Sequence, residues 1–401
     1  MEANILDNID PRQLGVALQR SRKRKGLTQD DAAKAIDVAR TTLVAIEKGE
    51  RRVKSIELLQ LARAYGSPIT DFVVPRPIVQ PFNSPQFRGP TSLTEQDRID
   101  IQPSLNEFED LCRNYLDLEG IVGSPMNRKY PAEYPMKGLS SDQAAENVAM
   151  EERQRLNLGD GPIPNLQNMM EQDIGLRLFF IDMPSKFSGV YYFDDQLGGC
   201  IAINRKHPLE RRRMSIAHEY AHFLTSRSEA VFSPEMSYLR VPESEKFASS
   251  FPMYFLLPTS GLARRYNDLL RSKEQVTLGD LSSLAHYYLV SFKALVLRLE
   301  GMKLVRTGLA DDIERQGFKV QQAKRQLGLI DNNSDESGLP SRYLYLALEA
   351  FQKEKIGESE FMRFLGVDRL ESRRIAETLR QSEEPVEMDQ VSSDMLAFEF
   401  A

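Results

Sequence analysis

The sequence contains little cysteine and no long apolar run. Its 401 residues include two cysteines, Cys112 and Cys200, which form no Cys-x-x-Cys pair. This scarcity argues against a disulfide framework and against a zinc site built from thiolates, so any metal must use histidine and carboxylate ligands. No stretch approaches the roughly 18 consecutive apolar residues of a membrane span, and the N-terminus has no basic segment followed by an apolar core. We therefore expect a cytoplasmic protein with no membrane partner.

The composition is that of an ordinary globular protein, with 41% hydrophobic and 27% charged residues. The net charge of -6 is unevenly distributed. Residues 11–65 carry 13 Lys or Arg against 6 Asp or Glu, a balance of +7, whereas residues 1–10 carry -3 and the rest of the chain therefore carries -10. A small basic module on an acidic protein predicts nucleic acid as a partner at one end only.

Residues 11–72 have the pattern of a compact set of helices. Thr28 is suited to cap a helix over residues 29–36, a short turn leads to a second helix over 41–47, and Gly49 ends it. A further helix is predicted over 56–65. Two short helices joined by a tight turn are the helix-turn-helix outline. A generic small bundle with a solvated basic face is the alternative.

The run from Leu27 to Arg52 resembles the lambda-repressor-like (XRE) DNA-binding domain along its whole length. Its specific marks are Leu27-Thr-Gln before one helix and Ile46-Glu-Lys-Gly-Glu-Arg after the next. The resemblance implies a DNA operator as partner and a recognition helix in the major groove. It implies two sets of contacts, to base edges from Arg40, Thr41 and Thr42 and to phosphates from Gln29, Arg51 and Arg52. A two-fold symmetric homodimer is expected for operator binding.

A change of pattern separates this module from the rest of the chain. Residues 74–90 hold five prolines in seventeen positions, which indicates a semi-extended linker. Helical patterns follow over 93–118 and 141–156. The period then becomes that of strands, predicted over residues 176–181, 189–193 and 199–204. We expect these three strands to form a small antiparallel sheet.

His218, Glu219 and His222 form a His-Glu-x-x-His motif within an amphipathic helical stretch, residues 214–224. Residues four apart share one face of a helix, so both imidazoles can reach one ion and Glu219 can touch a water bound to it. With only four histidines in the chain, the motif should arise by chance in about 0.003 sequences of this composition. The arginines at 211–213 are expected on the solvated side of this helix. A helix with two surface histidines is the alternative.

A catalytic zinc site takes three protein ligands and keeps the fourth position for water. Glu243 and Glu245 are the downstream acids on the next predicted helix, and their spacing does not choose between them. The strand at Cys200 to Asn204 is a candidate for pairing with an extended peptide substrate, and a purely structural core strand is an equal alternative. An oxyanion donor is also expected, and no pattern selects among Tyr191, Tyr192 and Tyr220.

Residues 85–260 resemble the ImmA/IrrE family of metallopeptidases, which is commonly fused behind an XRE domain. The marks are Phe87-Arg88, the Leu158-Gly-Asp-Gly-Pro-Ile163 turn, the Ile203-Asn204 pair, Arg213-Met-Ser-Ile-Ala-His-Glu-Tyr-Ala-His222, and the segment from Glu245-Lys-Phe-Ala248 to Pro258.

This resemblance implies a zincin-like fold with Zn²⁺ as the cofactor. It implies that Glu245 is the third metal ligand beside His218 and His222, and that Glu219 is the general base. The sequence departs from the family pattern at two positions near Glu245. Ser249 stands where the family prefers Asn or Asp, and Pro252 stands where it prefers Ala. A shorter Ser could loosen the hold on one ligating histidine and reduce activity.

Taken together, the patterns predict an α+β protein that is mostly helical. Four regions are expected: a helix-turn-helix domain at 1–73, a proline-rich linker at 74–92, a metallopeptidase domain with a small antiparallel sheet at 93–260, and a helical region with an acidic tail at 261–401.

The leading hypothesis is a zinc-dependent, site-specific endopeptidase fused to a DNA-binding domain. By the family resemblance, its protein partner would be a helix-turn-helix repressor or a similar regulator. The alternative is a transcriptional regulator or antitoxin in which the peptidase fold serves as a sensor or scaffold.

Overall fold

The computed structural model describes residues 9–67, 69–73, 87–88, 94–135, 138–227, 230–234, 242–273, 275–329 and 338–383. The chain divides into two compact units, Met1–Pro81 and Phe82–Ala401. Among the helices described, none combines the length and the apolar character needed to cross a bilayer.

The N-terminal unit is a small helical bundle. Its helices are α1 (Pro11–Arg24), α2 (Gln29–Ala35), α3 (Arg40–Glu47), α4 (Ser55–Tyr65) and α5 (Thr70–Val73). Thr28 begins α2 through a capping box with Asp31, and Gly66 ends α4 with a φ of 66°. The predicted helices are confirmed to within a residue at each end because these local signals specify them. Leucine, isoleucine and alanine side chains from all the longer helices form one core.

Helices α1 and α3 of this unit meet closely at their backbones. A Cβ atom at Gly15 would lie 2.5 Å from the backbone oxygen of Ile46, so only glycine fits in α1 at this point. Next to this contact Arg22 binds Glu47, with Nε 2.6 Å from Oε1 and Nη2 3.0 Å from Oε2. Both side chains are almost fully buried. Gln29 also donates to Glu47 over 3.0 Å, so one carboxylate links α1, α2 and α3.

The second unit is built on a five-stranded mixed sheet. Its strands are β1 (Phe87–Arg88), β2 (Arg177–Ile181), β3 (Phe187–Asp194), β4 (Gly198–Asn204) and β5 (Ala230–Pro234), in the order β1-β5-β3-β4-β2. Strands β3 and β4 are antiparallel, but β2 runs parallel to β4, and β1 runs parallel to β5.

The antiparallel sheet predicted from the sequence is therefore wrong for one of the three strands, because β2 runs parallel to its neighbour β4. Strand β4 lies between β2 and β3, so β2 and β3, which point in opposite directions, are not neighbours. The sheet also gains two short strands, β1 and β5. The former lies in the stretch predicted as linker, where two residues are too few for a periodic signal.

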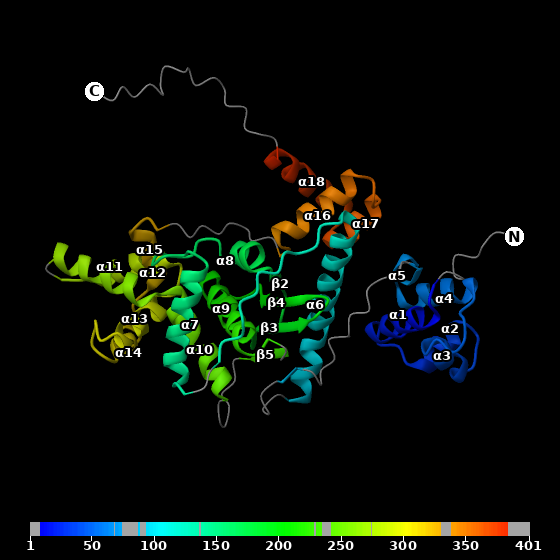
Figure 1. Ribbon diagram of the computed structural model, residues 1–401, viewed down its shortest axis with the longest axis horizontal. Helices are drawn as coiled ribbons and strands as arrows, with labels where there is room; N and C mark the ends of the chain where they lie inside the picture. Colours follow the sequence, from blue (N-terminus) through cyan, green and yellow to red (C-terminus); the bar gives the residue numbers. More distant parts are fainter. Residues whose placement is uncertain are drawn as a thin grey trace, which may run out of the picture. The chain divides into compact units, whose positions relative to one another are not determined.

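Helices cover both faces of the sheet (Figure 1). One face packs against α6 (Glu95–Val122), where Phe179 of β2 makes an edge contact with Phe108 at 6.1 Å between ring centroids. The other face packs against α9 (Leu209–Thr225), which in turn contacts α10 (Glu243–Leu256), and α10 contacts α7 (Ser141–Arg155). Because both faces are covered, β2 and β4 are buried at every residue.

The remaining helices extend the core beyond the sheet. A short α8 (Leu166–Met169) continues into a π-helical turn at Met170–Ile174. The later helices are α11 (Thr259–Ser272), α12 (Leu278–Tyr288), α13 (Phe292–Gly301), α14 (Leu309–Arg315), α15 (Val320–Gln326), α16 (Ser341–Gln352), α17 (Glu358–Leu365) and α18 (Arg369–Glu383). The core that holds α9 includes residues of α11 to α14. Buried Glu119 of α6 binds both Arg177 of β2 and Arg342 of α16, each at 2.8 Å, so α16 is tied to the sheet.

Arg213 shows where charge alone misleads. It was expected on the solvated side of its helix, yet it is buried and its guanidinium donates to the backbone oxygens of Leu289, at 3.1 Å, and Pro164, at 3.2 Å. The expectation is wrong because these carbonyl acceptors come from distant loops. Arg213 thereby links α9 to the turn between α12 and α13.

The buried Arg22–Glu47 pair generates a prediction about the N-terminal unit. Arg22→Met leaves the Glu47 carboxylate buried without its cation, and we expect the free energy of unfolding of this unit to fall by about 3–5 kcal/mol. Hydrogen exchange of α1 and α3 amides in the full chain measures it. The double variant Arg22→Met/Glu47→Leu replaces both charges by apolar groups and should recover most of the loss.

The Arg22–Glu47 pair also makes the stability of the N-terminal unit depend on pH. Burial would raise the pKa of Glu47, but the hydrogen bonds from Arg22 and Gln29 outweigh it, and the pKa lies below its usual value. The contribution of the pair is therefore present above the unfolded carboxyl pKa of about 4 and is lost as pH falls through the folded value. Equal stability of the single variant and the wild type would contradict this account.

Candidate metal centre

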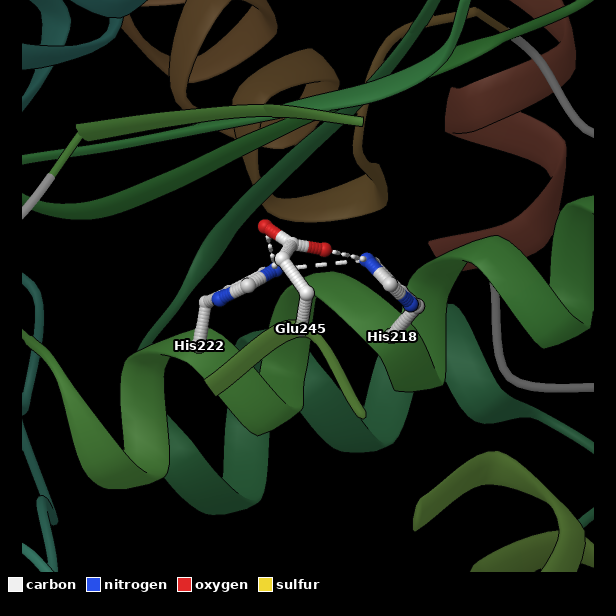
Figure 2. Close-up of side chains that lie close together, drawn as sticks. All are labelled: His218, His222 and Glu245. Carbon is white, nitrogen blue, oxygen red and sulfur yellow. Dashed lines mark hydrogen bonds and ion pairs between the residues drawn. The ribbon is translucent and has the colours of Figure 1, made fainter. Parts of the chain in front are cut away.

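Helix α9 presents His218 and His222 one turn apart on a single face. Figure 2 shows both imidazoles pointing toward the carboxylate of Glu245, which comes from the first turn of α10. The two Nε2 atoms lie 3.2 Å apart. Glu245 Oε2 lies 3.7 Å from His218 Nε2, and Oε1 lies 3.6 Å from His222 Nε2. Within the described part of the chain, these three residues are the one cluster of His, Cys, Asp or Glu whose geometry could hold a metal ion.

The structure separates the two acids that sequence spacing left open. Glu243, at the start of α10, is two-thirds exposed and pairs with Lys246 at 2.6 Å. Its carboxylate also accepts a hydrogen bond from Ser141 of α7. Glu245 is the acid whose carboxylate faces both imidazoles.

The donor set suits a tetrahedral metal ion. Two imidazoles and one carboxylate, with the fourth position left for water, are a known catalytic combination. Ligands about 2.1 Å from a tetrahedral ion lie about 3.4 Å from one another. The observed separations of 3.2, 3.6 and 3.7 Å bracket that value. The side chains therefore fit a metal ion without rearrangement of either helix.

Burial sets the charge state of the three groups. It lowers the pKa of His218 to about 4, against a smaller opposing effect of a hydrogen bond to the backbone of Ala248. It also lowers the pKa of His222 far below its usual value, and neighbouring His218 adds to the effect. Both imidazoles are thus neutral at pH 7, as ligation requires. The pKa of Glu245 is raised to about 7 because burial disfavours its charge.

Glu219 follows His218 in α9 and is fully buried. Its side chain lies directly against Gly189 of β3, where a Cβ atom would come within 2.6 Å of Glu219 Oε1. Strand β3 is irregular at this point, with a shift of register toward β5 between Phe187 and Gly189. Sequence reasoning missed Gly189, although a glycine inside a strand pattern is the usual sign of a close approach.

The opposite side of α9 is fixed by hydrogen bonds. Tyr220 is fully buried and its hydroxyl donates to Glu152 of α7, which also binds Tyr134, at 2.8 Å, and Arg155. The hydroxyl of Tyr191 donates to the backbone oxygen of Arg227 at 2.7 Å. Two of the three tyrosines considered as oxyanion donors are therefore engaged elsewhere, and Tyr220 holds the rotation of α9.

The structure contradicts one further expectation and leaves a second as a prediction. The substrate-pairing role considered for Cys200 to Asn204 is wrong, because these residues belong to β4, whose two edges are filled by β3 and β2. Ser249 was expected to weaken the hold on one ligating histidine, and its effect on activity stays a prediction. Ser249 is exposed, and the contact from α10 to His218 is made by the backbone of Ala248.

In the N-terminal unit, the residues implied as DNA contacts occupy the start of α3 and its surroundings. Arg40 and Thr41 are exposed, and Thr42 is half-buried. Gln29 contacts Arg40 at 3.4 Å and is otherwise engaged with Glu47. Arg52 is exposed, whereas Arg51 forms a two-point ion pair with Glu57 at 2.8 and 3.0 Å. The DNA contacts themselves stay predictions.

Comparison with known protein families finds two matches. Residues 18–72 match the family described as helix-turn-helix, and residues 171–300 match the family described as the IrrE N-terminal-like domain. No curated protein matches the chain. The chain thus joins a DNA-binding type of domain to a metallopeptidase-like domain. The first is of the XRE type and the second of the ImmA/IrrE type, and the second spans the sheet from β2 to β5, α9 and α10.

The two acids of α10 provide a matched test of the metal ligands. Glu245→Ala removes the carboxylate that faces both imidazoles, and we expect the purified protein to lose its stoichiometric metal. Glu243→Ala changes an exposed acid two residues away and should keep the metal. Elemental analysis after dialysis measures the metal content of both variants. Retention of the metal by Glu245→Ala would refute the assignment.

Gly189 supplies a second test. In Gly189→Ala the new methyl group would collide with Glu219, so we expect metal content to be kept while the turnover of a peptide substrate falls more than about tenfold, since a general base contributes about 10²- to 10⁴-fold. Gly120→Ala in α6 is the control because a Cβ there meets no atom within 4 Å. Unchanged turnover in Gly189→Ala would show that the position of Glu219 does not matter.

Proposed function

We propose that this protein is a zinc-dependent, site-specific endopeptidase that cleaves a regulatory protein and is joined to its own DNA-binding domain. The observation that carries the proposal is the convergence of His218, His222 and Glu245 with a buried acid, Glu219, on the same helix. The match of residues 171–300 to the IrrE N-terminal-like domain supports a peptidase reaction at this site.

The chemistry follows from the donor set. The two imidazoles and the carboxylate would hold the zinc ion, which would supply a bound water of pKa near 7 and Lewis-acid polarisation of a peptide carbonyl. Glu219 takes the proton from the attacking water and delivers it to the leaving amine. Its burial against Gly189 keeps the carboxylate away from bulk water and fixes its direction. Burial lowers the pKa values of His218 and His222, so both rings are neutral and their nitrogens can bind a metal ion.

The substrate class is inferred from the domain that accompanies the site. A basic helix-turn-helix unit, with Arg40 and Thr41 exposed on α3, brings the chain to DNA. A peptidase brought to an operator meets proteins that also bind there. A repressor-like helix-turn-helix protein is therefore the proposed substrate.

The decisive variant is Glu219→Gln, which keeps the shape of the side chain but cannot accept a proton. It should retain zinc and lose cleavage by at least about 100-fold. Because it still binds substrate, it serves as a trap for partners, which mass spectrometry identifies. Each trapped protein is then purified and incubated with wild type and variant. Equal cleavage by both would sink the enzymatic proposal.

Arg40→Ala separates this proposal from a purely regulatory one. If cleavage of the partner controls the target genes, Glu219→Gln should abolish regulation in cells. If only Arg40→Ala abolishes it, while Glu219→Gln behaves as wild type, the protein acts through DNA alone and the peptidase fold is a sensor or scaffold.

A further inference from the structure

The backbone of Ala248 makes a contact outside its own helix. Ala248 lies inside α10 and is fully buried, and its backbone hydrogen-bonds to the ring of His218 in α9. In a regular α-helix the carbonyl of each residue accepts from the amide four residues later. The carbonyl of Ala248 would accept from residue 252, and that residue is Pro252.

Proline removes the competing donor. It has no backbone N–H, and its ring pushes against the carbonyl of the residue four positions earlier and tilts it away from the helix axis. The residue opposed by Pro252 is Ala248. The carbonyl oxygen of Ala248 therefore lacks its usual helical donor.

The three positions share the face of α10 that meets α9. Glu245, Ala248 and Pro252 are spaced three and four residues apart, which places them on one side of the helix. Ala248 and Pro252 are buried, whereas Ser249, the neighbour on the other side, is exposed. In the imidazole of His218, Nε2 faces His222 and Glu245, so Nδ1 is the nitrogen left for the backbone oxygen.

We propose that Pro252 is a positioning residue of the metal centre: by withholding a helical N–H, it frees the carbonyl of Ala248 to accept from Nδ1 of His218, which aims Nε2 at the metal. A ligating histidine needs such an acceptor for its second nitrogen, because this hydrogen bond fixes both the tautomer and the ring direction. The proposal rests on the metal centre of the proposed function and adds a residue with no side-chain donor or acceptor of its own.

The test is Pro252→Ala in the full chain. The new amide competes for the Ala248 carbonyl, and zinc affinity, measured by competition with a chromophoric chelator, should fall about 10- to 100-fold. The same variant restores a helical hydrogen bond and replaces the poorest helix former by the best, so the Tm of the metal-free protein should rise. Changes of opposite sign cannot come from general damage to the fold.

Two control variants test whether the effect is specific to Pro252. Pro103→Ala alters the proline inside α6 and should raise Tm without changing zinc affinity. Ser249→Ala alters the exposed neighbour and should change neither. The ring nitrogens give a direct readout in the metal-free protein, because ¹⁵N shifts distinguish the tautomers. His218 should carry its proton on Nδ1 in the wild type and show a mixture of tautomers in Pro252→Ala.

The outcomes are distinguishable. A wild type that binds no zinc would overturn the proposed function, whereas the tautomer of metal-free His218 still tests the role of Pro252. Unchanged zinc affinity and tautomer in Pro252→Ala would overturn the inference and leave the peptidase proposal standing. A fall of Tm together with affinity would also count against it, since it would indicate damage to α10.

Discussion

The second unit depends on the burial of one helix that carries ionisable side chains. Helix α9 lies between the sheet and helix α10, so Glu219 and His222 are fully buried and His218 is mostly buried. Removing such groups from water is unfavourable unless partners receive them, and the surrounding elements act as those partners. Glu245 of α10 faces the imidazoles, Gly189 of β3 makes room for Glu219, and Glu152 of α7 anchors the far side through Tyr220. Each of these contacts joins α9 to another element of the unit.

Local signals predicted the elements well, and relations between distant segments poorly. The helix that bears the motif, the helices of the N-terminal unit and three strands follow from caps, glycines and periodicity. The order and relative direction of the strands do not follow from such signals, because no local feature of β2 or β3 indicates that β4 lies between them. The burial of Arg213 was hidden for a similar reason. Its acceptors are backbone carbonyls of residues 163, 164 and 289, and a carbonyl leaves no mark in a sequence.

The identity of the third candidate ligand was predictable only in part. Glu243 and Glu245 differ by two positions, which is about 200° around a helix, so only the rotation of α10 decides which one faces α9. The family resemblance selected Glu245, and the structure gives the physical reason. Helix α10 begins at Glu243 after Pro242, and buried Phe247, Ala248 and Phe251 turn one side of it toward the core. Glu245 precedes Ala248 by one turn on that side, whereas Glu243 pairs with Lys246 in solvent.

Two residues of the site contradict the secondary structure in which they lie. Glycine weakens a strand and proline weakens a helix, yet Gly189 stands inside β3 and Pro252 inside α10. Local rules fail most often where a chain gives up stability for function. Gly189 gives up side-chain packing where Glu219 needs the space, and Pro252 gives up a helical hydrogen bond where His218 needs an acceptor. Pro103 shows that such an exception needs a contact to acquire meaning: it too interrupts a helix, but it is exposed on α6, away from the core. A residue that breaks a local rule points to function when it also faces a buried polar group, and both Gly189 and Pro252 meet that condition.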